Sequence, residues 1–164
     1  GGFIFITKGA IRQAKNEDEL AAILAHEISH ITLKHEINEI KKSNILKELS
    51  QQFAENNREV IKKLTDFVVN NLLVKGRNRK DEYEADAHSL QYLSAHNYNP
   101  VLHFYLIGLK KDGAANARRI DYLTKTHPPI DERVSRLMGL SNFTGSLIDY
   151  RLERFRLSTA SVFK

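Results

Sequence analysis

The stretch LAHEISHITLKHE, residues 24–36, carries three histidines and two glutamates within an otherwise apolar part of the chain. On a helix, the four-residue spacing of His26 and His30 brings both side chains to one face, separated by roughly 40° of rotation. Two imidazoles so placed can hold one zinc ion, and Glu27 can reach a water molecule at that ion. The apolar neighbours of these histidines indicate a buried stretch, and burying unpaired histidines would be costly. The pattern therefore favours a zinc site over two exposed histidines.

A catalytic zinc site usually has three protein ligands, so a third ligand is required. In one known arrangement it is a histidine shortly downstream, which requires a glycine at residue 33 and a histidine at residue 36. The chain has Leu33 and Glu36 at those positions, so this arrangement fails. His35 lies nine residues after His26, roughly 180° around a continuous helix. We therefore expect His35 to be a surface or packing histidine.

The best source of a third ligand is the segment DEYEADAHS, residues 81–89. Glu82 and Asp86 are four residues apart and share a helix face, which fits a carboxylate ligand with a supporting carboxylate beside it. Metal-bound histidines commonly donate their second N–H to such a supporting group. Glu84 lies about 200° from Glu82 and is expected to point elsewhere. A solvated helix end is the alternative that composition alone favours, and only the paired histidines justify the search.

The rest of the sequence predicts one mainly helical domain. Asn16, followed by Glu19, is the signature of a capped helix start, and that helix is expected to run to about Glu36. The residues at the start of the chain, GGFIFITKG, are typical of a short strand. Amphipathic helices are predicted within 37–75. A further helix is predicted from near Asn78 to the helix-terminating residues Asn97–Pro100, and another from Pro100 to about Lys111. The last two are predicted from the Pro-Pro turn to Gly139 and over 146–157.

Composition sets limits on function. The 164 residues suit a single domain over 1–164, and the lack of cysteine excludes disulfides, thiolate zinc sites and cysteine nucleophiles. The net charge of +5 comes from basic residues interleaved with acidic ones, which indicates a solvated surface rather than a nucleic-acid interface. No apolar run reaches the roughly 18 residues of a membrane span, and no signal peptide is visible. Because the chain starts at Gly1 without a methionine, we expect a fragment that lacks upstream residues.

Three motifs in this order resemble those of a known family. They are His26-Glu27-x-x-His30, Glu82-x-x-Ala85-Asp86 and THPPIDERVSRL at 126–137. Together they resemble the gluzincin-type zinc metallopeptidases of the HtpX and CAAX prenyl protease family. The resemblance covers most of residues 1–36, 76–93 and 124–138.

The resemblance implies a role for each matched residue. It implies His26, His30 and Glu82 as ligands of one zinc ion per chain, and Glu27 as the general base. It implies a supporting role for Asp86, which we expect to orient a ligand because it should stay ionised near zinc. It also brings His127 to the active site, and Arg79 and Arg133 to its neighbourhood.

The implied fold is α+β and mainly α, with a zincin-like core. It comprises an active-site helix, a second ligand-bearing helix and a small sheet whose edge is the strand at Phe3–Thr7. The prenyl and heat-shock branches carry membrane-spanning helices around the catalytic core, whereas the interval 37–75 of this chain is polar and amphipathic. The resemblance is therefore to the soluble, envelope-associated branch, which argues against CAAX peptides as substrates. A periplasmic or membrane-associated location in a bacterial cell envelope is expected.

The expected function is a zinc-dependent endopeptidase that uses a zinc-activated water on polypeptides, with a role in envelope protein quality control. Its partners would be unfolded or misassembled envelope proteins. A chaperone-like protein-binding module with a latent zinc site is the first alternative, and a basic nucleic-acid-binding domain is the second. His127 has two possible functional roles: it can donate a hydrogen bond to the oxyanion, or it can occupy the open zinc position and hold the enzyme latent. The alternative is a loop histidine that only packs against the Pro-Pro turn.

Overall fold

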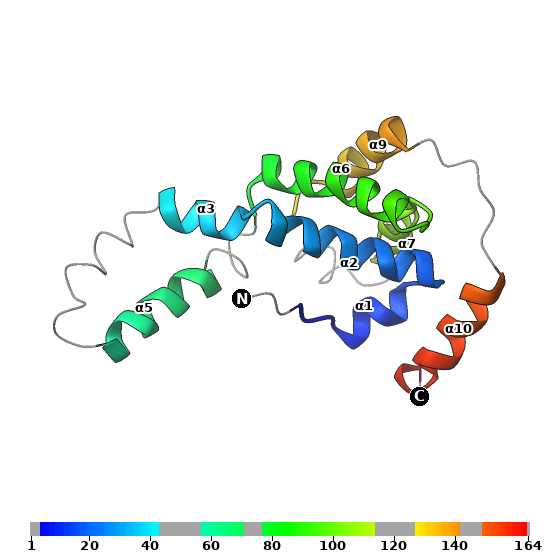
Figure 1. The fold of residues 1–164 in the computed structure, drawn as a ribbon, viewed down its shortest axis with the longest axis horizontal. Helices are drawn as coiled ribbons and strands as arrows, with labels where there is room; N and C mark the ends of the chain where they lie inside the picture. Colours follow the sequence, from blue (N-terminus) through cyan, green and yellow to red (C-terminus); the bar gives the residue numbers. More distant parts are fainter. Residues whose placement is uncertain (1–3, 43–56, 71–76, 114–126, 142–148, 164) are drawn as a thin grey trace.

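The computed structural model describes residues 4–42, 57–70, 77–113, 127–141 and 149–163. Within these ranges the chain is helical, with no strand (Figure 1). The edge strand expected at Phe3–Thr7 is therefore not found, although Phe3 itself lies outside the described ranges. The reason is local, because Thr7 is the N-cap of helix α1 (Lys8–Gln13), where its Oγ1 accepts a hydrogen bond from the Ala10 N–H at 3.0 Å.

Two helices form the centre of the molecule and carry the candidate ligands. Helix α2 (Glu17–Thr32) lies along helix α6 (Arg79–Ala95), as Figure 1 shows. Small side chains with at most 6% exposure line their contact, and the distance between packed helices depends on the side chains between them. These small residues are Ala22, Ala25, Ser29, Ala85 and Ser89. The close approach lets polar side chains of the two helices meet.

The start of α2 agrees with the sequence prediction. Asn16 is the N-cap, and its Oδ1 accepts a hydrogen bond from the Glu19 N–H at 2.9 Å. The Glu19 carboxylate in turn accepts from the Lys15 N–H at 3.1 Å. One unpaired donor of the first turn and the N–H just before the N-cap are therefore satisfied. Arg151 of helix α10 (Asp149–Thr159) pairs with Asp18 in the first turn at 2.7 Å. The beginning of α2 is therefore fixed both locally and by the C-terminal helix.

The end of α2 differs from the prediction. The helix stops at Thr32, and a separate helix α3 (His35–Lys42) follows. Lys34 adopts the left-handed conformation, with φ of 57°, which costs a residue other than glycine roughly 1–2 kcal/mol. The turn changes the phase of the chain, so that His35 is only 5% exposed. Burial of the His35 side chain is a favourable tertiary interaction that accompanies the strained backbone of Lys34.

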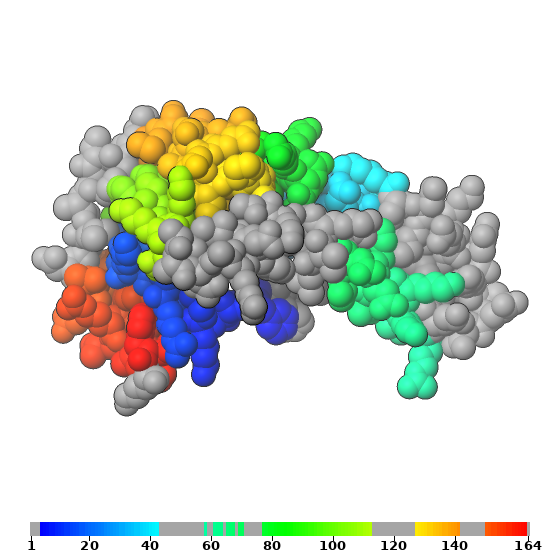
Figure 2. All heavy atoms as spheres, turned by 180° about the vertical axis from the view of Figure 1, so that it is seen from behind, coloured from blue at the N-terminus to red at the C-terminus, as the bar shows by residue number. Residues whose placement is uncertain are grey.

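The remaining helices build the core and one outlying arm. Helices α7 (Leu102–Gly113) and α9 (Ile130–Leu140) pack against α2 and α6, close to their predicted positions, and the short helix η2 (Ala160–Val162) follows α10. Figure 2, the view from behind, shows α10 beside the N-terminal helices. Helix α5 (Asn57–Val69) stands apart from α2 and α6 in both views. No described helix combines the length and the apolar character that a membrane crossing needs.

The hydrophobic core lies where α2, α6, α7 and α9 meet. Large apolar side chains of α6, α7 and α9 supply most of its volume, together with Phe155 from α10. Its buried leucines are Leu90, Leu93, Leu102, Leu106, Leu109 and Leu137. The polar residues discussed below lie at one end of the α2–α6 contact, against this core.

Candidate metal centre

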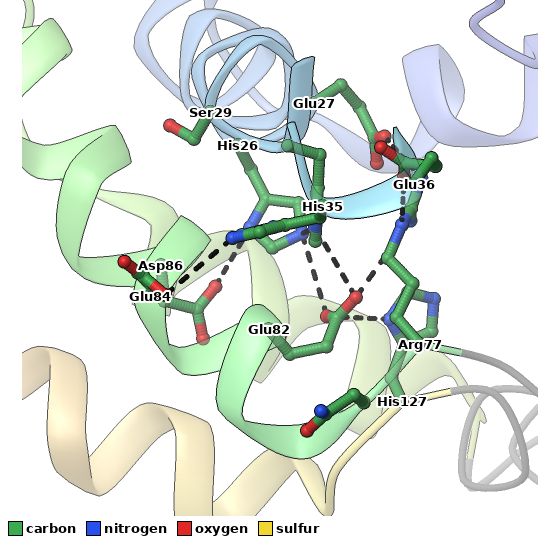
Figure 3. A network of polar contacts seen from close by, with 12 residues as sticks. His26, Glu27, Ser29, His35, Glu36, Arg77, Glu82, Glu84, Asp86 and His127 are labelled. Atoms are coloured by element: carbon green, nitrogen blue, oxygen red, sulfur yellow. Dashed lines mark hydrogen bonds and ion pairs between the residues drawn. The ribbon is translucent and has the colours of Figure 1, made fainter. Parts of the chain in front are cut away.

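Three ligand atoms converge between α2 and α6. The Nε2 atoms of His26 and His30 lie 3.1 Å apart. Glu82 Oε2 lies 3.6 Å from the first of these atoms, and Glu82 Oε1 lies 3.4 Å from the second. All three residues are at most 5% exposed. Figure 3 shows Glu82 reaching from α6 toward the histidine side of α2.

The spacing of these atoms fits a tetrahedral zinc ion. With zinc-to-ligand distances of about 2.0–2.2 Å, neighbouring ligand atoms in a tetrahedron lie about 3.3–3.6 Å apart. The two histidine nitrogens lie 3.1 Å apart, and each has one oxygen of the Glu82 carboxylate at a comparable distance, Oε2 at 3.6 Å from His26 and Oε1 at 3.4 Å from His30. In addition, Glu82 Oε1 is buried without a hydrogen-bond partner among the described residues. A cation at this point would satisfy that oxygen and both imidazole lone pairs, and it would leave a fourth position free.

Asp86 and Arg133 form the support of His26. Asp86 Oδ1 lies 3.0 Å from His26 Nδ1, a short contact that falls outside the geometry of a regular hydrogen bond. Arg133 donates to both oxygens of Asp86, at 2.6 and 2.8 Å. Burial alone would raise the pKa of Asp86, but the hydrogen bond from Arg133 and the contact with His26 lower it below its ordinary value. Asp86 is therefore an ionised acceptor beside a candidate ligand.

Burial also sets the charge of His26. Loss of solvent lowers its pKa below the ordinary 6.5, and the positive charge of Arg133 acts in the same direction. The contact with Asp86 acts against this shift and is outweighed. The imidazole is therefore neutral at neutral pH, which is the form that binds a metal.

His127 lies against the Glu82 carboxylate. Its Nδ1 is 2.8 Å from Glu82 Oε2, and its side chain is 25% exposed. Burial tends to raise the pKa of Glu82, but contacts with His127 and His30 outweigh it, so the pKa is held well below its ordinary value. The structure thus brings His127 to the candidate ligands, as expected, through Glu82 rather than through the histidines.

Glu27 faces the same region from the next position of α2. Its side chain is 33% exposed, and its Oε2 lies 3.4 Å from Arg77 Nη2. Arg77 also donates to Glu36 at 2.9 Å (Figure 3). Arg77 could not be identified from the sequence, because it precedes α6 and has no helical spacing to reveal it. The family resemblance implied Arg79 near the site, but that residue is exposed in the first turn of α6.

A pocket of about 310 Å³ opens beside Glu27. Its polar wall comprises His26, Glu27, His127 and Arg133. The rest of the lining is mainly apolar and includes Ile4, Ile6, Ile23, Leu24, Leu102, Tyr105, Leu106, Leu109 and Ile130. The polar groups therefore adjoin a space suited to an apolar side chain.

His35 packs against His30 and does not lie on the far side of the helix, where a continuous helix would have placed it. The Nδ1 atoms of the two rings are 2.9 Å apart, and both side chains are buried. Glu84, which was expected to point away from Glu82, is half exposed, and its Oε2 lies 3.7 Å from His35 Nε2. No glycine or proline near Lys34 announces the break that turns His35 inward, so the sequence offered no signal for this position.

Comparison with known proteins gives two matches. The model of peptidase family M48 matches residues 1–141, which include every site residue described above. The mitochondrial metalloendopeptidase OMA1 of Schizosaccharomyces pombe is 31% identical to this chain over 100 residues. That match covers 61% of this chain and 29% of the yeast protein, so it spans less than a third of its relative's length.

Proposed function

Because the chain belongs to peptidase family M48, we propose that it is a zinc-dependent endopeptidase that hydrolyses peptide bonds within polypeptides. The observation that carries this proposal is the convergence of two buried imidazole nitrogens and a buried carboxylate within 3.6 Å of one another. Glu27 stands at the neighbouring position, on the wall of a pocket. Ligands, base and substrate space thus adjoin one another.

In this proposal His26, His30 and Glu82 hold the zinc ion. When bound there, zinc supplies a Lewis acid and lowers the pKa of a water molecule toward ~7. Glu27 accepts the proton of the attacking water and passes it to the leaving nitrogen, for which its partial exposure at the pocket is suited. His127 donates a hydrogen bond to the oxyanion. Asp86, kept ionised by Arg133, holds the His26 ring and its tautomer.

The proposed substrates are polypeptides with an apolar side chain beside the scissile bond. The apolar wall of the pocket supports this choice. Residues 4–7 also line the pocket, and the backbone at Thr7 is extended. We propose that an extended substrate pairs with Phe3–Thr7 through main-chain hydrogen bonds. Binding of the substrate would then bring Phe3–Thr7 into the strand pairing that is absent from the described residues.

The proposed setting is quality control of unfolded or misassembled proteins of the cell envelope. It rests on the likeness of the motifs to the envelope-associated branch of the family. Cleavage of unfolded casein, with a preference for apolar residues next to the cut, is the expected activity. A profile dominated by charged residues at both flanking positions would contradict the assignment of the pocket.

Glu27→Gln tests the mechanism. The variant should bind zinc in the same ratio as the parent, because no ligand is changed, and it should lose cleavage of casein. Metal analysis of the chelator-free protein and a casein digest measure the two properties. Cleavage by the variant at the parent rate would show that Glu27 is not the base.

One observation favours a second candidate, a protein-binding module with a latent site. Arg77 lies against Glu27, and Glu82 lies against His127. The proposed base, Glu27, and the proposed oxyanion donor, His127, therefore already have partners. A protein of this kind would bind unfolded polypeptides without cleaving them. Retention of labelled casein by the zinc-loaded protein, with no fragments after prolonged incubation, would favour this candidate.

A further inference from the structure

We propose that His35 is a positioning residue for His30: it accepts the second N–H of that imidazole and so directs His30 Nε2 at the metal. This inference rests on the proposed zinc site. The chain would then hold its two ligating histidines by different means, an aspartate for His26 and a neutral imidazole for His30.

The geometry of the two rings carries the proposal. His30 Nδ1 and His35 Nδ1 lie 2.9 Å apart, which is a hydrogen-bond distance. The ring centroids are 4.9 Å apart and the ring planes are inclined by 73°, so the rings meet at their edges rather than stack. His30 is 1% exposed and His35 is 5% exposed. Water therefore has little opportunity to replace either partner.

Counting protons assigns the direction of the hydrogen bond. A neutral imidazole carries one N–H, and the other nitrogen accepts. If His30 Nε2 gives its lone pair to a metal, the proton of His30 must lie on Nδ1 and be donated to His35. His35 Nδ1 is then the acceptor, and the proton of a neutral His35 must lie on its Nε2.

The surroundings of His35 Nε2 agree with that proton. This nitrogen is buried and has no hydrogen-bond partner among the described residues. The Glu84 carboxylate lies 3.7 Å from this nitrogen. Asp81 also brings a carboxylate oxygen within 4.8 Å of a ring nitrogen of His35 and of the Glu84 carboxylate. A carboxylate at the Nε2 edge of the ring favours the tautomer with the proton on that edge.

A neutral acceptor also suits the charge of the site. Glu27, Glu82 and Asp86 already bring three carboxylates to the metal region, and His26 has one of them as its support. An imidazole at His35 supports His30 without adding a fourth negative charge. The left-handed turn at Lys34 is what delivers this ring, because on an unbroken helix it would point away.

Two substitutions test the acceptor. In His35→Asn, Oδ1 can take the position of Nδ1 and still accept from His30, whereas His35→Phe keeps a ring and removes the acceptor. Competition with a chromophoric chelator gives the zinc affinity of each folded variant. His35→Phe should weaken zinc binding about 10–100-fold, the usual effect of losing such a partner, and His35→Asn should stay close to the parent.

His103→Phe is the matched control, since His103 is another buried histidine, 6% exposed, in helix α7 away from the ligands. Its zinc affinity should equal that of the parent. Unchanged affinity in His35→Phe, or equal losses in both His35 variants, would overturn the proposal. A parent that binds no zinc would refute the proposed function instead, so the two failures are distinguishable.

A measurement on the unsubstituted protein covers the case in which His35→Phe does not fold. Long-range ¹⁵N–¹H correlation spectra of the zinc-loaded protein report which ring nitrogen carries each proton. The proton should lie on Nδ1 of His30 and on Nε2 of His35. A proton on Nδ1 of His35 would make that nitrogen a donor, which is incompatible with the proposal.

Discussion

Replacing Arg133 with leucine should destabilise the protein by about 3–5 kcal/mol, the usual cost of removing one partner from a buried ion pair. The structure places this pair in that class: Arg133 is 5% exposed, Asp86 is 3% exposed, and two hydrogen bonds of 2.6 and 2.8 Å join them. Arg133 Nη1 also lies 3.6 Å from Glu82. The substitution leaves the buried Asp86 carboxylate without its cation, against a total stability of typically 5–15 kcal/mol.

The effect on zinc affinity has two opposing parts. Loss of a positive charge favours a bound cation, but burial then raises the pKa of Asp86, which should take up a proton and cancel that gain. A protonated Asp86 is a weaker acceptor for His26 Nδ1, so zinc affinity should fall about 10–100-fold. Arg133→Lys keeps the charge but not the forked geometry and should give intermediate values.

Arg151→Leu provides the control for this prediction. Arg151 is 6% exposed and pairs with Asp18, which is 1% exposed, far along α2 from the ligands. Urea unfolding in excess chelator measures stability without metal, and both leucine variants should lose a similar amount. Only Arg133→Leu should also lose zinc affinity. A change below about 1 kcal/mol for Arg133→Leu, as for an exposed pair, would refute the reasoning.

Three further predictions concern other residues. Glu82→Ala should abolish stoichiometric zinc binding and Glu84→Ala should retain it, as metal analysis would show; the reverse result would mean that the ligand assignment is wrong. His127→Ala should keep zinc and lower kcat about 10²–10³-fold through loss of an oxyanion donor, whereas a faster enzyme would indicate a latching role. Burial lowers the pKa of His103 below 6.5, so its contribution to stability is present above that pH and is lost as the pH falls toward the pKa of the folded state. His103→Phe should therefore flatten the loss of unfolding free energy below about pH 6.5, and an unchanged slope would assign that loss to other groups.

The shared face of His26 and His30, and that of Glu82 and Asp86, could be predicted from the sequence because helical phase is a local property. That these two faces meet was implied only by the resemblance to a known family, since the packing of α2 on α6 is a tertiary contact. A four-residue spacing fixes a common face wherever the helix is regular, and α2 and α6 are regular across these positions. Helical rotation also predicted that Glu84 points away from Glu82. In the structure the Glu82 carboxylate faces His30 and the Glu84 carboxylate faces His35. The capped start of α2 was equally local.

The features that could not be predicted from the sequence depend mainly on tertiary contacts. The break at Lys34 occurs at a residue with no special preference for the left-handed region, and the burial of His35 accompanies it. Arg77 reaches Glu27 from a segment outside any helix, where no periodicity applies. The strand expected at Phe3–Thr7 failed because Thr7 caps α1 instead, a role that its β-branched side chain also allows.

Helix α5 stands apart from the two ligand-bearing helices, as part of the stretch 43–78 that connects α3 with α6 (Figure 1). That stretch is a chain loop closed by the packing of α2 on α6. The entropy of closing a loop grows only with the logarithm of its length, so doubling it costs about 0.6 kcal/mol. Spacing within each ligand motif is fixed by helical rise and rotation, whereas the separation between the motifs is almost free to vary. We therefore expect homologous chains to tolerate wide differences in length at this connection while keeping the same arrangement of His26, His30 and Glu82.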